Sequence, residues 1–202
     1  MPQVVNMRPF LTMQFHAKAS ETITPRDILP QDLARIAVEC FIARRTTVAP
    51  PAELSGVLAE RAGAFVTLRH LSGALRGCIG TIDPTRENVA IEIVQNAISA
   101  ATGDPRFPRV AMDELADLTY GVDVLSPPEP VGGIQDLDPF HYGVIIEALD
   151  GTEAGRRGLL LPRIDGIDTA DQQWRAVHMK ARIEIGTRIR VERFNVRRFG
   201  KE

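Results

Sequence analysis

The chain has 202 residues, of which 44% are hydrophobic and 25% are charged, the composition of an ordinary globular protein with a sizeable core. Its formal net charge of −2 gives no general argument for binding nucleic acid or an anionic membrane. Two cysteines without a C-x-x-C pair argue against a disulfide scaffold and a structural zinc site. No stretch has the length of a membrane span or the pattern of a signal peptide, so we expect a cytoplasmic protein.

Residues 1–24 show no clear period and are expected to form an N-terminal arm, with one domain over residues 25–202. From Pro30 onward, apolar residues recur at helical spacing and predict an amphipathic helix. Cys40 falls on the apolar stripe of this helix, so we interpret it as a small core residue. The predicted stripe consists of Leu33, Ile36, Ala37, Cys40 and Phe41.

A hairpin of two strands is predicted next. Residues 64–70 alternate between apolar and polar side chains, residues 71–73 indicate a turn, and residues 75–81 form the partner strand. Successive side chains of a strand point to opposite faces, so this partner strand has an apolar face that we expect on the core. That face holds Leu75, Ile79 and Thr81.

The opposite face of the same strand carries Arg76 and Cys78, so a guanidinium and a thiol are expected side by side. Gly77 and Gly80 keep bulk away from the thiol and would let a ligand or another backbone approach closely. We therefore interpret this strand as a candidate site, and we count the two glycines and Thr81 among its candidate binding residues.

A largely buried helix follows, for which Asp83 is the predicted N-cap and Pro84 the predicted first residue. Gly103 is expected to end it. If the N-terminus of this helix points back toward Cys78, its partial positive charge would favour the thiolate.

The helix leads into Asp104-Pro105-Arg106-Phe107-Pro108, a loop that two prolines stiffen. Asp104 can brace the turn by accepting a backbone hydrogen bond. Two interpretations remain open: a structural plug, or a support that holds the Arg106 guanidinium and the Phe107 ring for an anionic ligand.

The second half of the chain predicts a short helix, three strands, a long irregular connection, a further helix and a closing strand. The closing strand shifts its apolar face by one residue, which predicts a β-bulge near Glu192-Arg193. Thr169 is the predicted cap of the last helix. The other elements are a short helix over 113–118, strands over 118–124, 142–149 and 157–161, and a connection over 126–133.

Together, the cysteine heptapeptide 75–81 and the Arg-Phe-Pro loop 104–108 resemble the AMMECR1 domain family, most of all its prokaryotic branch known as AmmeMemoRadiSam system protein A. The resemblance runs from Ile28 to Phe199. Further matches are residues 64–68, 124–130 and 158–162, and His141 with Gly143.

This resemblance implies an α+β fold, with a mixed, mainly antiparallel sheet flanked by helices and a smaller subdomain packed on it. It also implies that the cysteine motif lies at a cleft, and that the protein acts in a pathway with Memo-like and radical SAM proteins. The family has no settled biochemical activity. Similar members carry Lys-Ala-Gly where this chain has Lys180-Ala181-Arg182, so that corner departs from the family pattern.

Two functional hypotheses follow from these residues. In the first, the chain is a cysteine-dependent enzyme in which Cys78 is the nucleophile, Arg76 favours the thiolate or binds an anionic group, and His141 is the general base. In the second, it is a non-catalytic module whose cleft binds a peptide, a metabolite or a protein tail. Recognition would then come from Arg76, Arg106 and Phe107.

Other classes have less support in the sequence. The basic C-terminal strand could contact RNA, but only Phe194 and Phe199 are available there for stacking. The four histidines and two cysteines lack the spacing of zinc ligands. We therefore expect no metal, no cofactor, no nucleic acid and no membrane partner.

Overall fold

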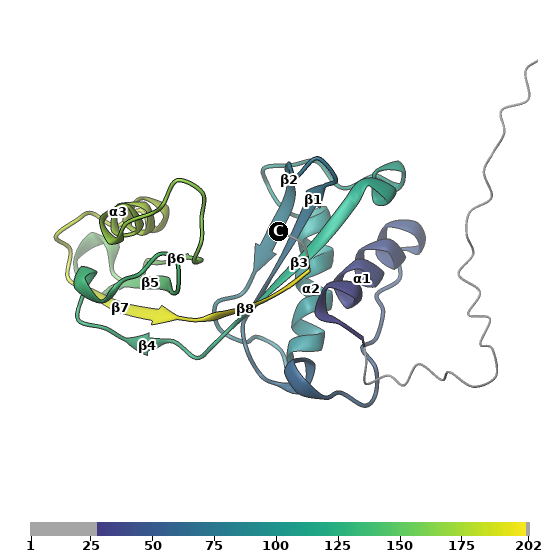
Figure 1. The fold of residues 1–202 in the computed structure, drawn as a ribbon, viewed down its shortest axis with the longest axis horizontal. Helices are drawn as coiled ribbons and strands as arrows, with labels where there is room; N and C mark the ends of the chain where they lie inside the picture. Colours follow the sequence, from purple (N-terminus) through teal and green to yellow (C-terminus); the bar gives the residue numbers. More distant parts are fainter. Residues whose placement is uncertain (1–27, 201–202) are drawn as a thin grey trace, which may run out of the picture.

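A computed structural model, which describes residues 28–200, shows an α+β fold with two four-stranded antiparallel sheets (Figure 1). The large lobe contains the sheet β2-β1-β3-β8 and two helices, and the small lobe contains the sheet β4-β7-β5-β6 and one helix. The large lobe is formed by α1 (Pro30–Arg44), β1 (Ala64–His70), β2 (Leu75–Gly80), α2 (Val89–Thr102), β3 (Leu118–Leu125) and β8 (Val196–Gly200). The small lobe is formed by β4 (Glu129–Pro130), β5 (Gly143–Ala148), β6 (Arg157–Leu160), α3 (Ala170–Ala181) and β7 (Ile189–Phe194). Short 3-10 turns lie at Gly56–Ala59, Met112–Asp117, Ile134–Asp136 and Gly151–Glu153.

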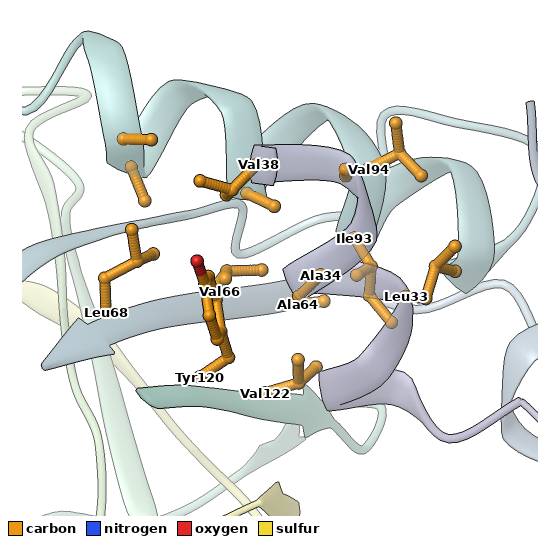
Figure 2. Packing of buried hydrophobic residues seen from close by; sticks show 14 of the residues in the cluster. Leu33, Ala34, Val38, Ala64, Val66, Leu68, Ile93, Val94, Tyr120 and Val122 are labelled. Carbon is orange, nitrogen blue, oxygen red and sulfur yellow. The ribbon is translucent and has the colours of Figure 1, made fainter. Parts of the chain in front are cut away.

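The main core lies between one face of the large sheet and the two helices that cover it (Figure 2). Leu33 and Val38 enter it from α1, Ile93 from α2, and Val66 and Leu68 from β1. Burial of these side chains at about 25 cal/mol per Å² drives the packing of the helices onto the sheet. Because both helices lie on the same side, the opposite face of the large sheet is left for the small lobe.

A smaller apolar cluster joins the two lobes. Phe65 and Leu125 come from strands of the large sheet, whereas Ile145, Leu159 and Phe194 come from the small sheet. An ion pair between Asp83 and Arg157 adds a polar link between the lobes. The small lobe therefore covers the free face of the large sheet around Phe65 and Leu125, whereas Cys78 on that face stays partly exposed.

Several predicted elements are confirmed. The strand over residues 64–70 and its hairpin partner are β1 and β2, which pair antiparallel. The hairpin of the small lobe is β5 with β6. Thr169 caps α3 and forms a capping box with Gln172, as the pattern predicted. The expected N-terminal arm, residues 1–24, lies outside the described residues.

The predicted start of α2 is wrong. Asn88 is its N-cap and accepts a hydrogen bond from the Ile91 amide, so the helix begins at Val89 rather than Pro84. The reason is Glu92, whose carboxylate is only 1% exposed and accepts hydrogen bonds from the backbone amides of Thr85 and Arg86. These bonds hold the preceding segment as a loop, a tertiary effect that local helix signals do not reveal.

Three further expectations change. The buried stripe of α1 is Leu33, Ala34, Ala37 and Val38, so Cys40 lies beside it and is only partly buried. The short helix after residue 111 is a 3-10 turn. The predicted bulge near Glu192-Arg193 is absent, because β7 pairs with β5 in continuous register and ends at Phe194. The chain then crosses into the large sheet at Asn195, which explains the shift of the apolar face.

Candidate functional site

Cys78 lies on β2, the edge strand of the large sheet, and faces away from the two helices. Its register partner on β1 is Thr67, whose hydroxyl lies 3.3 Å from the Cys78 sulfur and donates to it. Both side chains are partly exposed. A hydroxyl donor at this position can stabilise negative charge on the sulfur.

The open edge of β2 at Cys78 is closed by two side chains instead of another strand. The Cys78 amide donates to Asp104 Oδ2 at 2.9 Å, and the Arg106 guanidinium donates to the Cys78 carbonyl at 3.3 Å. Arg106 also donates two hydrogen bonds to the Asp104 carboxylate, from Nε to Oδ1 at 2.9 Å and from a terminal nitrogen to Oδ2 at 2.7 Å. The loop therefore acts as a structural brace that satisfies the backbone of an edge strand.

The electrostatics of the brace match its geometry. Asp104 is only 4% exposed, and the hydrogen bonds from Arg106, aided by the Cys78 amide, hold its pKa well below the ordinary range despite burial. The same contact raises the pKa of Arg106. Half of the Arg106 side chain remains exposed to solvent, so its outer face can still attract an anion.

Arg76 does not lie beside the thiol on an open wall, which corrects the expectation for this residue. It is only 5% exposed, and its guanidinium binds both oxygens of Glu114, at 2.7 and 3.0 Å. A third nitrogen donates to the Pro108 carbonyl at 2.9 Å. These hydrogen bonds lower the pKa of Glu114. Arg76 is therefore a buried cation that is held by a carboxylate and a backbone carbonyl.

A register shift explains this outcome. Leu68 pairs with Gly77, whereas the next residue, Arg69, pairs with Leu75, so Arg76 has no partner on β1. Such an irregularity turns the side chain out of simple alternation. Phe107 lies against this corner, its ring centroid 5.9 Å from the Arg76 guanidinium and 5.5 Å from that of Arg106.

The glycines of the motif serve packing. A Cβ on Gly77 would lie 2.3 Å from the Ala100 carbonyl of α2, and one on Gly80 would lie 2.2 Å from the Phe65 ring. Thr81 donates its hydroxyl to Glu92 at 2.6 Å. Because Gly77 lies against the last turn of α2, the N-terminus of that helix points elsewhere, and the expected dipole effect on Cys78 is wrong.

His141 lies at a different place. Its Nδ1 is 2.7 Å from Asp138 Oδ2, and no hydrogen bond or ion pair among the described residues joins it to Cys78. It lines a cavity of about 320 Å³ between the lobes, whose walls also include Arg163 and Arg198 but not Cys78. The structure thus gives no contact for the expected pair of base and nucleophile.

Lys180 of α3 is the ionisable group that the sequence reasoning missed. Its side chain reaches solvent, yet burial by the surrounding protein lowers its pKa. The charge of a Cys78 thiolate opposes that shift and Arg106 adds to it, so all three groups lie within electrostatic range. The only sequence signal for Lys180 was the Lys-Ala corner noted above. Its proximity to Cys78 has no local pattern, because α3 and β2 are brought together by the packing of the small lobe on the large lobe.

No group of three or more His, Cys, Asp or Glu side chains within residues 28–200 is arranged to hold a metal ion. In the same range no helix combines the length and the apolar character needed to cross a membrane. The side chains that contact the Cys78 sulfur or lie within electrostatic range of it are Thr67, Arg106 and Lys180.

Comparison with known proteins places this chain among relatives of the same kind. A family model described as AMMECR1 matches residues 31–201. A protein of Thermotoga maritima is 54% identical over 141 residues, which cover 69% of this chain and 78% of that protein. A protein of Methanothermobacter thermautotrophicus is 41% identical over 136 residues, which cover 65% of this chain and 68% of that protein.

Two further matches concern length and fold. A Clostridium acetobutylicum protein is 44% identical over 136 residues, which cover 67% of this chain but only 28% of that protein. The crystal structure of the uncharacterized protein PH0010 from Pyrococcus horikoshii matches with a TM-score of 0.76 at 29% identity. That match covers 86% of this chain and 90% of the other, so both lobes belong to the shared fold.

Proposed function

The chain belongs to the AMMECR1 family, and on that premise we propose that it is a cysteine-dependent enzyme with Cys78 as its nucleophile. The observation that carries the proposal is the surroundings of the thiol. The sulfur accepts a hydrogen bond from Thr67, and two cations, Arg106 and Lys180, lie within electrostatic range of it. Positive surroundings and partial exposure distinguish reactive cysteines from structural ones.

Lys180 takes the role that His141 was expected to fill. An amine whose pKa is lowered by burial has a larger neutral fraction near pH 7, and a neutral amine can accept a proton. The thiol proton of Cys78 passes to the neutral Lys180 nitrogen, and the thiolate forms a bond to an electrophilic carbon of the substrate. The ammonium and the thiolate form an ion pair until the new bond to sulfur is made. The bond from the substrate carbon to its leaving group breaks, the leaving group takes the electron pair, and the Lys180 ammonium returns the proton to it.

Arg106 sets the substrate class in this proposal. Its guanidinium is already neutralised in part by Asp104, but its exposed outer face can orient one anionic group of the substrate. We therefore propose a small electrophilic substrate that carries a negative charge. The family resemblance supports the further proposal that the reaction belongs to a pathway with Memo-like and radical SAM proteins.

Alkylation with iodoacetamide across a pH series, with the label located by mass spectrometry, tests this function. Cys40 provides an internal comparison, because it is also a partly buried free thiol but lies on α1. We expect Cys78 to react faster than Cys40 across the pH series, because only the thiolate attacks and Arg106 and Lys180 lie within electrostatic range of Cys78. A Cys78 that stays inert until unfolding would contradict the nucleophile and favour a non-catalytic binding module.

The variant Lys180→Gln sharpens the test. Removal of the cation should slow alkylation of Cys78 at pH 7 and leave that of Cys40 unchanged. The matched control is Arg175→Gln, which removes a positive charge from an exposed position on the same helix. Equal slowing by both variants would show a general charge effect and would remove Lys180 from the mechanism.

A further inference from the structure

The cavity that His141 lines is separate from the surroundings of Cys78 and has its own chemistry. It opens between the loop before β5, the loop after β6 and the crossing of the chain into β8. Its volume of about 320 Å³ is at the lower end of the range for small-molecule sites, so it fits a metabolite rather than a polymer.

Arg163 is held in an unusual conformation at the wall of this cavity. Its backbone has φ of 58°, in the left-handed region that costs a non-glycine residue about 1 kcal/mol or more. Its amide donates to the Pro139 carbonyl at 2.7 Å and its Nε donates to the Phe140 carbonyl at 3.1 Å. The first bond holds the backbone of Arg163 and the second holds its side chain, and strain of this kind is concentrated at functional sites.

The guanidinium of Arg163 has no carboxylate partner within residues 28–200, so its two terminal nitrogens are not neutralised. Two other wall residues already face carboxylates. Arg198 binds Asp123, with 2.7 Å between Nε and Oδ1, and Nδ1 of His141 lies 2.7 Å from Asp138 Oδ2. Among the described residues of the wall, Arg163 is therefore the cation without a carboxylate partner, and its single charge matches a monoanion better than a dianion.

Apolar surface completes the cavity. Phe140 is 49% exposed, a large fraction for a phenylalanine, and Val196 also lines the cavity. We propose that this cavity binds a small carboxylate with an apolar body, with the carboxylate on the terminal nitrogens of Arg163 and the body against Phe140 and Val196. The proposal does not depend on the reactivity of Cys78.

Titration of the ¹⁵N-labelled protein with three matched probes, followed by NMR, tests the proposal. Benzoate carries the proposed group, benzamide has the same shape without charge, and phenyl phosphate carries a larger negative charge. Ionic strength is kept constant with sodium chloride, because exposed charges are screened by salt. We expect benzoate to shift the amides of Asn195 and Val196 in a saturable manner, and to bind more tightly than the other two probes.

The variants Arg163→Asn and Arg163→Gly remove the guanidinium while tolerating the left-handed backbone, so at least one should keep the fold. Each should weaken benzoate binding about tenfold or more, the loss expected for one charged hydrogen-bonding partner. Arg175→Gln, outside the cavity, should leave binding unchanged. Equal binding of benzoate and benzamide, tighter binding of phenyl phosphate, or unchanged affinity in both Arg163 variants would overturn the proposal.

Discussion

The backbone amide of Cys78 and the carboxylate of Asp104 are joined by a hydrogen bond of 2.9 Å that replaces a neighbouring strand. Because β2 is an edge strand, this amide would otherwise face solvent or another chain. The cysteine motif and the Arg-Phe-Pro loop are therefore one structural unit. The loop fixes the backbone that carries the thiol, while the thiol itself stays on the open face of the sheet.

Substitution of Asp104 by Asn should destabilise the protein. The amide of Asn can still accept one hydrogen bond, but it cannot neutralise Arg106 and it places a donor where the carboxylate accepted. We expect a loss of about 1–3 kcal/mol in the free energy of unfolding at pH 7, measured by urea denaturation. Asp113→Asn, on an exposed carboxylate of the 3-10 turn, is the control and should change little. An unchanged free energy of unfolding in Asp104→Asn would show that the brace does not contribute to stability.

The same carboxylate predicts a pH dependence. The pKa of Asp104 in the folded protein is lowered, first of all by the hydrogen bonds from Arg106, whereas the unfolded chain has the ordinary value of about 3.9. Its contribution to stability is therefore complete above about pH 5 and is lost as pH falls through the unfolded pKa toward the lower folded pKa. The difference in unfolding free energy between the wild type and Asp104→Asn should shrink between pH 5 and about pH 2. A constant difference over that range would contradict the ion pair.

Arg76 and Glu114 should behave as a coupled structural pair. We expect Arg76→Met to cost about 3 kcal/mol, because it leaves Glu114 without its cation, and Glu114→Gln to cost less. The double variant should recover part of the loss, with a coupling energy of about 1–3 kcal/mol in a double-mutant cycle. Alkylation of Cys78 per folded molecule should not change. Slower alkylation of Cys78 in Arg76→Met without a loss of stability would instead show that Arg76 contributes to the reactivity of the thiol.

Sequence reasoning predicted the elements that local signals decide. The hairpin β1–β2 follows from alternation and a turn, and the start of α3 follows from a capping box. In both cases the residues that determine the element are its neighbours in the sequence. The start of α2 was missed because the buried Glu92 holds the preceding loop by contacts that no local pattern shows. Tertiary contacts override helix-start signals in this way.

The candidate site was predicted only in part. Cys78 was singled out because a thiol between glycines on a strand is unusual, and the structure places it partly exposed on the face of the sheet that was expected. The direction of the Arg76 side chain depends on the register shift between β1 and β2, which strict alternation does not predict. Lys180 and His141 are placed by the packing of one lobe on the other. A pairing of that kind has no sequence period and needs the structure.

The two glycines beside Cys78 should differ in their tolerance of alanine. A Cβ on Gly77 meets the backbone carbonyl of Ala100, which cannot move without shifting α2, whereas a Cβ on Gly80 meets mainly the Phe65 ring. We therefore expect Gly77→Ala to cost about 3 kcal/mol and Gly80→Ala less, in urea denaturation. Phe65→Ala, which removes the ring atoms that this Cβ would meet, should lower the cost of Gly80→Ala and leave that of Gly77→Ala unchanged. The opposite order of costs would argue against helix packing as the reason for Gly77.

The end of α3 offers a stabilising substitution. Arg182 has φ of 55° and ψ of 44°, the left-handed conformation in which glycine has no steric penalty. Its amide bonds to the carbonyls of His178 and Met179, and its carbonyl accepts from Arg156 at 2.6 Å, so its backbone is used but its side chain is exposed. Glycine is the residue most often found in this conformation after the last turn of a helix.

We expect Arg182→Gly to raise the free energy of unfolding by about 0.5–1 kcal/mol, because relief of the left-handed strain exceeds the extra entropy of glycine in the unfolded chain. Arg182→Ala is the matched control, since it removes the same side chain but keeps a Cβ in the strained conformation. Urea denaturation of both variants at one pH measures the difference. If alanine stabilised the protein as much as glycine, the loss of a positive charge next to Lys180 would be the cause, and backbone strain at this corner would be negligible.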